Sequence, residues 1–186
     1  MKASVYIATS LDGFIARENG GLDWLEGGGE GSNDEVNGDK RQGEDYGYKA
    51  FMNSVDALVM GRNTYEKVRS FGGWTYGDKP VVVLSSRLVE IPEHLSKTVE
   101  AMSGSPGEVV ARLSERGMKH LYIDGGVTLQ RFLRAGLIQR LIITRIPVLI
   151  GAGIPLFGPL GGDIKLRHVR TQSYPSGLVQ SEYEVV

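Results

Sequence analysis

Hydrophobic residues fall along this 186-residue chain in short runs that alternate between the spacing of strands and the spacing of helices. Apolar, mostly β-branched runs predict strands at residues 5–8, 57–60, 81–84, 98–102, 121–123 and 141–146. Helical spacing lies between the middle runs, at residues 46–53, 63–69, 106–116 and 127–135. Alternation of strand and helix is typical of an α/β domain with a mostly parallel sheet.

The last part of the chain has a different pattern. Residues 164–173 and 178–185 alternate apolar and polar side chains on either side of Pro175, Ser176 and Gly177. Such alternation about a turn sequence predicts an antiparallel hairpin. The sequence has no internal repeat and no change of composition. We therefore expect residues 1–186 to form a single domain, with a central mostly parallel sheet, flanking helices and this hairpin at its edge.

The overall composition limits the kinds of partner. Lys and Arg total 21 against 22 Asp and Glu, so net charge favours neither nucleic acid nor a membrane surface. No apolar run approaches the roughly 20 residues of a membrane span, and the first residues are typical of a strand rather than a signal peptide. The absence of cysteine excludes disulfides and thiolate metal sites and fits a reducing cytoplasm. The spacing of the three histidines, His94, His120 and His168, is not that of metal ligands, so we expect no metal. From the charge balance and the absence of cysteine we expect a small-molecule substrate and a cytoplasmic location.

Two of the predicted strands end on glycine where a helix is expected to begin. The first corner is residues 61–64 (GRNT), and the second is residues 125–129 (GGVTL). Glycine lets backbone approach an anion closely, and the unpaired N–H groups of a helix N-terminus can bind phosphate. Arg62 in the first corner can hold a phosphate through two N–H groups. We therefore predict an extended nucleotide cofactor with phosphate at each corner, and ordinary strand-to-helix turns are the alternative.

A third polar cluster follows the strand predicted at residues 81–84. Ser85, Ser86 and Arg87 place two hydroxyl groups and a guanidinium group at the C-terminal end of that strand, where ligands bind in open α/β sheets. Together with Arg62, this set suits the 2'-phosphate that distinguishes NADP from NAD. A serine-rich turn that faces water explains the same residues.

A polar, glycine-rich stretch at residues 19–47 follows the first strand. A segment this long in a compact domain is usually functional, and we interpret it as an active-site lid, with a tolerated surface insertion as the alternative. Among the carboxylates, Asp12 and Asp45 fit turn or helix-start positions, and Asp124 fits a bond to its own local backbone.

Together these segments resemble the dihydrofolate-reductase-like superfamily, and in particular the bacterial riboflavin-biosynthesis reductases of the RibD C-terminal domain type. Residues 10–16 (SLDGFIA) and 124–157 (DGGVTLQRFLRAGLIQRLIITRIPVLIGAGIPLF) carry the resemblance to the riboflavin enzymes. Residues 58–68 (LVMGRNTYEKV) and 81–86 (VVVLSS) look more like dihydrofolate reductase itself. The resemblance spans most of the chain, and it implies an NADPH-dependent reductase whose cofactor lies across the strand ends.

The resemblance also assigns individual residues to the cofactor and the substrate. It implies that the nicotinamide meets the backbone of one residue of the first strand and that the phosphate groups meet the three polar clusters. The implied cofactor-binding residues are Ala8, Ile15, Gly61, Arg62, Asn63, Thr64, Ser85, Ser86, Arg87, Gly125, Gly126, Val127, Thr128 and Leu129. On the substrate side the implied residues are Asp12 and Trp24.

Two positions depart from the family patterns. Phe14 stands where the riboflavin-type signature has lysine or arginine, which leaves recognition of a phosphosugar open. Dihydrofolate reductase uses a buried carboxylate to support protonation of its substrate. In this sequence only Glu44 or Asp45 lies near the corresponding position. We take Asp45 as the catalytic candidate. A helix-start role for Asp45 and proton supply by bound water are the alternatives.

We thus expect an NADPH-dependent reductase that resembles 5-amino-6-(5-phosphoribosylamino)uracil reductase and transfers hydride to a small heterocyclic or ribosylamine substrate. Dihydrofolate reduction is one alternative, and a nucleotide-binding module without turnover is another. The apolar segment at residues 147–157 fits a homodimer interface, since family members are often dimeric, and it fits core packing equally well.

Overall fold

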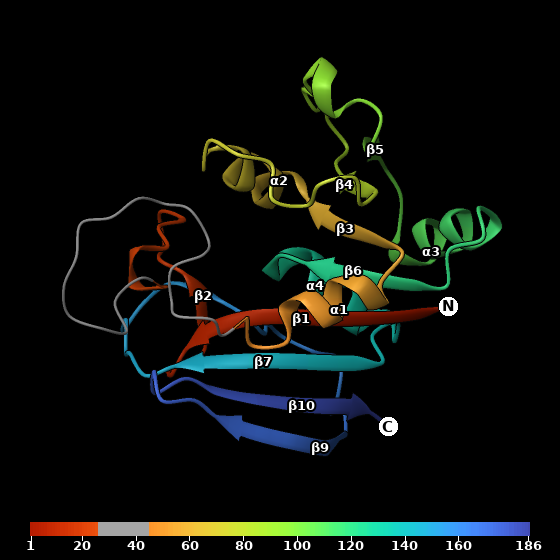
Figure 1. Ribbon diagram of the computed structural model, residues 1–186. Coiled ribbons are helices and arrows are strands. Elements are labelled where there is room, and N and C mark those ends of the chain that lie inside the picture. Colours follow the sequence, from red (N-terminus) through yellow and green to blue (C-terminus); the bar gives the residue numbers. More distant parts are fainter. Residues whose placement is uncertain (26–44) are drawn as a thin grey trace.

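An eight-stranded sheet forms the centre of the computed structural model, which describes residues 1–25 and 45–186. The strand order is β5-β4-β3-β6-β1-β7-β10-β9. The first six of these strands are parallel to one another, whereas β10 runs antiparallel to β7 and β9 antiparallel to β10. Figure 1 shows the sheet from β5 at one edge to the β9–β10 hairpin at the other. The predicted mostly parallel sheet with an antiparallel C-terminal hairpin is therefore confirmed.

The strands of this sheet are β1 (Lys2–Ser10), β3 (Ala57–Gly61), β4 (Val81–Leu84), β5 (Val99–Met102), β6 (His120–Asp124), β7 (Arg140–Ile146), β9 (Leu166–Ser173) and β10 (Val179–Val185). The helices are α1 (Tyr48–Ser54), α2 (Arg62–Arg69), α3 (Pro106–Glu115) and α4 (Gly126–Arg134), with short 3-10 turns η1 (Asp23–Leu25) and η2 (Glu93–Leu95). A separate pair, β2 (Phe14–Ala16) and β8 (Ile154–Pro155), joins the turn after β1 to the segment after β7. Within the described ranges, every helix is too short or too polar to cross a membrane.

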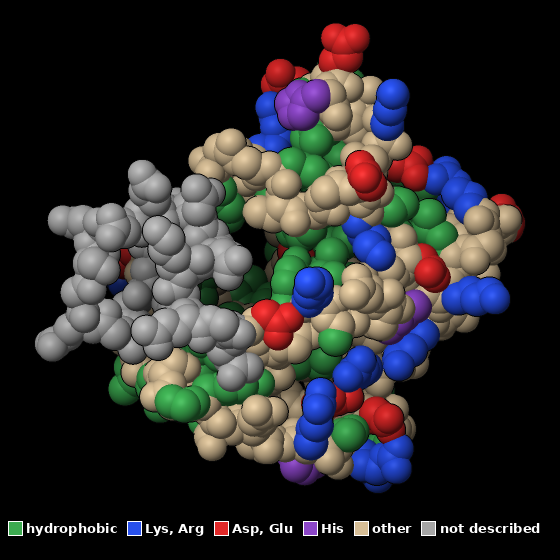
Figure 2. Space-filling model, in the orientation of Figure 1, with side chains coloured by type: hydrophobic (Ala, Val, Ile, Leu, Met, Phe, Trp, Pro, Cys, Tyr) green, Lys and Arg blue, Asp and Glu red, His purple; other side chains and the backbone are tan. Residues whose placement is uncertain are grey.

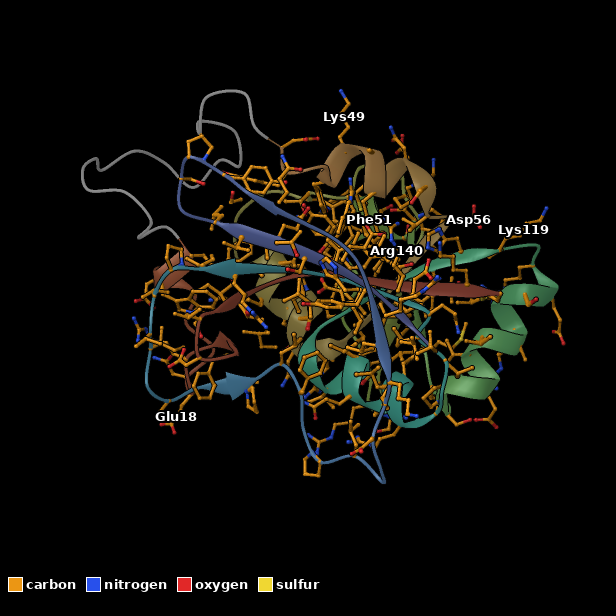
Figure 3. All side chains as sticks on the ribbon, turned by 90° about the horizontal axis from the view of Figure 1, so that it is seen from below. Glu18, Lys49, Phe51, Asp56, Lys119 and Arg140 are labelled. Carbon is orange, nitrogen blue, oxygen red and sulfur yellow. The ribbon has the colours of Figure 1, made fainter. Side chains whose placement is uncertain are left out.

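The helices cover both faces of the sheet. Side chains of α3 and α4, such as Leu113 and Phe132, pack with one set of strand residues, and side chains of α1 and α2, such as Phe51 and Tyr65, pack with the other. Figure 3 shows Phe51 directed from α1 to the sheet, while Lys49 of the same helix points away from it. Because successive strand residues face opposite sides, strands in the middle of the sheet contribute apolar side chains to both helical layers.

Two predicted elements have wrong bounds for identifiable reasons. The first strand extends over residues 2–10 rather than 5–8 because it pairs with β6 and with β7, and its polar residues Ser4 and Ser10 are buried. The helix predicted from residue 46 begins at Tyr48. Tyr46 and Gly47 have φ angles of 54° and 82°, which a right-handed helix cannot accommodate.

Candidate functional site

A cleft of about 1010 Å³ lies along the C-terminal ends of the parallel strands. Its walls come from strands β1, β2, β3, β4, β6 and β8, from residues along α2 and in the first two turns of α4, and from the segments that follow β2 and β4. Figure 2 shows the molecule hollowed between α2 and β1. Open α/β sheets bind ligands at this edge because the strands end there and the helices begin.

Almost all of the predicted cofactor-binding residues line this one cleft. They are Ala8, Ile15, Gly61, Arg62, Asn63, Thr64, Ser85, Ser86, Arg87, Gly125, Gly126, Val127 and Thr128. Leu129 does not, because its side chain is fully buried in the core and its N–H group donates to Gly125 O at 2.9 Å. The three polar clusters, which are separate in sequence, therefore meet in space.

The two glycine corners pack directly against each other. A Cβ atom on Gly125 would collide with Thr64 Oγ1, and one on Gly61 would lie 3.0 Å from Thr128 Oγ1. Gly125 also has a φ of +84°, a conformation that side chains rarely adopt. Gly125 is therefore required by the contact between the corners, and Gly61 fits closely against Thr128. The sequence suggested only that they leave room for an anion.

Both helix N-termini are open to the cleft. The residues that precede them, Gly61 and Gly125, offer no side-chain cap, and no other side chain in the described ranges forms a cap hydrogen bond there. The first N–H groups of a helix have no partner within the helix and carry a partial positive charge. The corners therefore suit the oxygens of an anionic ligand.

Basic side chains reinforce this character. Arg62, Lys67, Arg87 and Arg131 line the cleft. Arg62 Nε lies 3.5 Å from Glu66 Oε1 in a partly exposed ion pair, and Arg131 Nη2 donates to Gly104 O at 3.1 Å. These cations come from three different elements of the fold, so they surround the cleft rather than forming one patch.

The serine–arginine cluster after β4 has a local structure of its own. Ser85 Oγ accepts a hydrogen bond from Arg87 N at 3.0 Å and donates one to Arg87 O at 2.8 Å. Ser85 thus shapes the turn, as the serine-turn alternative expected. Ser86 and the side chain of Arg87 remain exposed on the cleft wall.

Asp124, the last residue of β6, brings a carboxyl group into the cleft. Its Oδ1 accepts from Gly125 N at 2.8 Å, and its Oδ2 accepts from Tyr76 Oη at 3.4 Å. Burial raises the pKa of Asp124 to about 6, although hydrogen bonds with Gly125, Tyr76 and Tyr122 act in the opposite direction. A carboxyl group that titrates close to neutral pH in a ligand cleft is a candidate proton donor.

Only one of the two hydrogen bonds described for Asp124 could be predicted from the sequence. The bond to its own backbone was predicted, and the structure contains it. The contact with Tyr76 joins residues that are 48 apart in sequence, so no local pattern could have indicated it. The one available signal was a charged residue at the end of an otherwise apolar strand.

Asp45, the predicted catalytic residue, lies at the start of α1. Its carboxylate accepts from Gly47 N at 2.9 Å and from Lys49 N at 3.0 Å, and these bonds lower its pKa. This is the geometry of the helix-start alternative. Among the described residues, Asp45 is exposed and does not line the cleft. Glu44, the other candidate, and most of the predicted lid, residues 26–44, lie outside the described residues.

The two predicted substrate residues, Asp12 and Trp24, do not line the cleft in the described structure. Asp12 accepts from Gly151 N at 2.8 Å and from Ile150 N at 3.1 Å, so it ties the turn after β1 to the loop after β7. Trp24 is buried against Ile146, and its Nε1–H has no acceptor among the described residues. Their assignment to substrate stays a prediction.

Comparisons with known proteins agree with this architecture. Residues 2–180 match the RibD C-terminal domain. The uncharacterized protein YwjB of Bacillus subtilis (strain 168) is 35% identical over 176 residues, which are 93% of this chain and 92% of that protein. A putative riboflavin biosynthesis protein from Shewanella sp. PV-4 is 40% identical, with a TM-score of 0.88 over 100% of this chain and 99% of the other.

A more distant structure identifies the wider fold. Dihydrofolate reductase from Enterococcus faecalis, complexed with NADP(H), is 16% identical with a TM-score of 0.64 over 99% of this chain and 96% of its own. At this identity the likeness establishes the fold alone. The fold is thus dihydrofolate-reductase-like, and the match over residues 2–180 shows that the chain belongs to the RibD C-terminal domain family.

Proposed function

We propose that this protein is an NADPH-dependent reductase that transfers hydride to a small heterocyclic or ribosylamine substrate. The observation that carries the proposal is the meeting of two uncapped helix N-termini and a buried carboxyl group in one cleft. Membership of the RibD C-terminal domain family supports the same activity.

The residues present fit a dinucleotide. A volume of about 1010 Å³ is ample for an extended cofactor with a small substrate beside it. The first N–H groups of α2 and α4 would hold diphosphate oxygens, with Arg62 as a charged partner. When bound, NADPH would supply the hydride. The protein would supply the binding groups, the orientation and a proton.

Preference for NADPH over NADH would come from the polar cluster after β4. Ser86 and Arg87 stand on the cleft wall beside the end of that strand, and Arg62 reaches the same cleft from α2. A 2'-phosphate carries two negative charges, and guanidinium groups bind phosphate through paired, charge-assisted hydrogen bonds.

Asp124 would supply the proton. With a pKa of about 6, about a tenth of its carboxyl groups carry a proton at pH 7. The protonated form can donate to a substrate atom that becomes basic as hydride arrives. In this proposal Asp124 takes the role that the sequence assigned to Asp45.

The cofactor assignment is tested by titrating the protein with NADPH and with NADH while following tryptophan fluorescence. We expect NADPH to bind at least about tenfold more tightly, because charge-assisted hydrogen bonds contribute about 1.5–3 kcal/mol each. Arg87→Ala should weaken NADPH binding more than NADH binding, whereas Arg62→Ala, which also removes a partner of the diphosphate, should weaken the binding of both cofactors. Arg116→Ala, outside the cleft and paired with Glu100, is the matched control. Equal affinity for the two cofactors would contradict the 2'-phosphate assignment.

The substrate is tested by turnover with aminopyrimidine ribosylamines, with and without the 5'-phosphate, and with dihydrofolate. Consumption of NADPH with a ribosylamine supports the proposal. Turnover of dihydrofolate alone supports the dihydrofolate reductase alternative. Tight NADPH binding with no oxidation by any of these compounds would identify a nucleotide-binding module instead.

A further inference from the structure

We infer that Tyr76 is a positioning residue whose hydroxyl group holds the Asp124 carboxyl group in place at the cleft, and which thereby sets the pH range of the reaction. The second half of this inference rests on the proposed function, because it takes Asp124 as the proton donor. The first half concerns the protein alone. Tyr76 belongs to the segment between α2 and β4, which the sequence did not connect with the site.

Both oxygens of the Asp124 carboxyl group are engaged, each by a different element. Oδ1 accepts from Gly125 N at 2.8 Å within the second glycine corner. Oδ2 accepts from Tyr76 Oη at 3.4 Å. One hydrogen bond would leave the carboxyl group free to turn about its Cβ–Cγ bond. A second bond, from a different element, restricts that rotation.

Tyr76 is itself held firmly. Its ring packs edge-on against Trp74, with ring centroids 5.2 Å apart, and Trp74 packs in the same way against Tyr65 at 6.0 Å. Tyr65 is fully buried on α2. Lys79 N donates to Tyr76 O at 3.1 Å, which closes a turn around the residue. The position of the hydroxyl group is therefore fixed by edge-on packing of three aromatic rings, the last of which, Tyr65, belongs to α2.

Two other phenol groups lie near Asp124. Tyr122 Oη donates to Tyr6 O at 2.8 Å, and a hydrogen bond between Tyr122 and the Asp124 carboxyl group has a smaller lowering effect on the pKa of Asp124 than that of Tyr76. Tyr48 on α1 also faces the charge of Asp124, and no hydrogen bond between the two is present in the described structure. Within residues 1–25 and 45–186, the titratable side chains that interact with Asp124 are thus Tyr76, Tyr122 and Tyr48, and Tyr76 donates to Oδ2.

The ionisation of the pair is consistent with this assignment. Burial, and next the charge of Asp124, raise the pKa of Tyr76 far above its usual value of 10, so its hydroxyl group remains a donor throughout the working range of pH. That donor stabilises the carboxylate form of Asp124 and partly offsets the effect of burial on the pKa of Asp124. Loss of the hydroxyl group should therefore raise the pKa of Asp124 further.

The test is a Tyr76→Phe variant, which removes one oxygen and keeps the ring on Trp74. The pKa of Asp124 is measured in the ligand-free protein from the ¹³C NMR shift of its carboxyl carbon, which an Asp124→Asn variant identifies. In Tyr76→Phe we expect this pKa to rise from about 6 by up to about one unit. Tyr183→Phe, on β10 and packed against His168, is the matched control and should leave it unchanged.

The pH dependence of kcat/KM gives the second readout. If Asp124 is the proton donor, the limb that reports its ionisation should move to higher pH in Tyr76→Phe, by the same amount as the NMR titration. An unchanged or lower pKa of Asp124 in Tyr76→Phe would overturn the positioning role. A raised pKa with no turnover of any substrate would support the positioning role while the proposed function fails.

Discussion

Replacing Asp124 by asparagine should make the protein more stable above neutral pH and much less active. Burial raises the pKa of Asp124 from 3.8 to about 6, so between these values the folded protein holds a proton that the unfolded chain has released. The contribution of this group to stability is therefore highest below about pH 4, falls as pH rises, and stays low above about pH 6. Asparagine cannot ionise, and it keeps an oxygen that can accept from Gly125 N.

The size of the effect follows from the pKa. A rise from 3.8 to about 6, at about 1.4 kcal/mol per unit, corresponds to at most about 3 kcal/mol. Because part of the residue remains open to the cleft, we expect Asp124→Asn to raise the free energy of unfolding by about 1–2 kcal/mol at pH 8. At pH 4 the variant and the original protein should differ little.

Urea denaturation followed by tryptophan fluorescence at pH 4, 6 and 8 measures this difference. Asp56→Asn is a control that should lower, rather than raise, the free energy of unfolding at pH 8. The backbone amides of Lys119 and His120 donate to this exposed carboxylate and lower its pKa. In the same preparation, turnover by Asp124→Asn should fall by a factor of about 10²–10⁴ through loss of the proton donor. A variant that is less stable at pH 8, or that differs equally at all three pH values, would refute the assignment of a buried, weakly acidic carboxyl group.

Three other changes test the packing around the site. Gly125→Ala should lower the free energy of unfolding by about 2–4 kcal/mol, because the added Cβ would collide with Thr64 of the first glycine corner. Gly72→Ala is the control, since Gly72 has a similar φ of +81° and no neighbour within 4 Å, and it should lower stability by about 1 kcal/mol. Calorimetric unfolding of the two variants separates the cost of the collision from the cost of backbone strain. Glu182→Gln should cost about 1–3 kcal/mol at pH 7, because Glu182 Oε1 accepts from Arg140 Nε at 2.6 Å. Since that bond lowers the pKa of Glu182 below its usual value of 4.5, the loss should shrink as pH falls from about 4.5 through the lowered pKa, and a constant loss at all pH values would contradict it. Ser105→Ala removes the capping box of α3 and should lower stability by about 1 kcal/mol, as thermal unfolding would detect.

The sequence was a good guide wherever burial was uniform. The strand predicted at residues 81–84 has the observed bounds, because all four of its side chains are buried. The first strand was predicted too short, since Ser4 and Ser10 are polar yet buried. Strands β2 and β8 contain three residues and two residues, which is too few for any periodic pattern. They exist because the chain returns to the turn after β1, and that return is a property of the whole fold.

The candidate site also has one part that could be predicted from the sequence and one part that could not. Its backbone part was predictable because a strand, a glycine and a helix start adjoin one another in sequence. Its carboxyl group was not, because what distinguishes Asp124 from Asp45 is environment. Asp45 bonds to two exposed amides that follow it directly in the chain, whereas Asp124 is enclosed by aromatic residues from distant segments.

The positions of the two chain ends have a practical consequence. Lys2 N pairs with Lys119 O at the start of β1, and Val185 N pairs with Gln139 O beside the start of β7. Both ends therefore lie at the strand edge opposite the cleft, on the same side of the molecule in Figure 1. A surface anchor or a fluorescent label joined to either end would leave the mouth of the cleft facing solution, so binding by immobilised protein can be compared directly with binding by free protein.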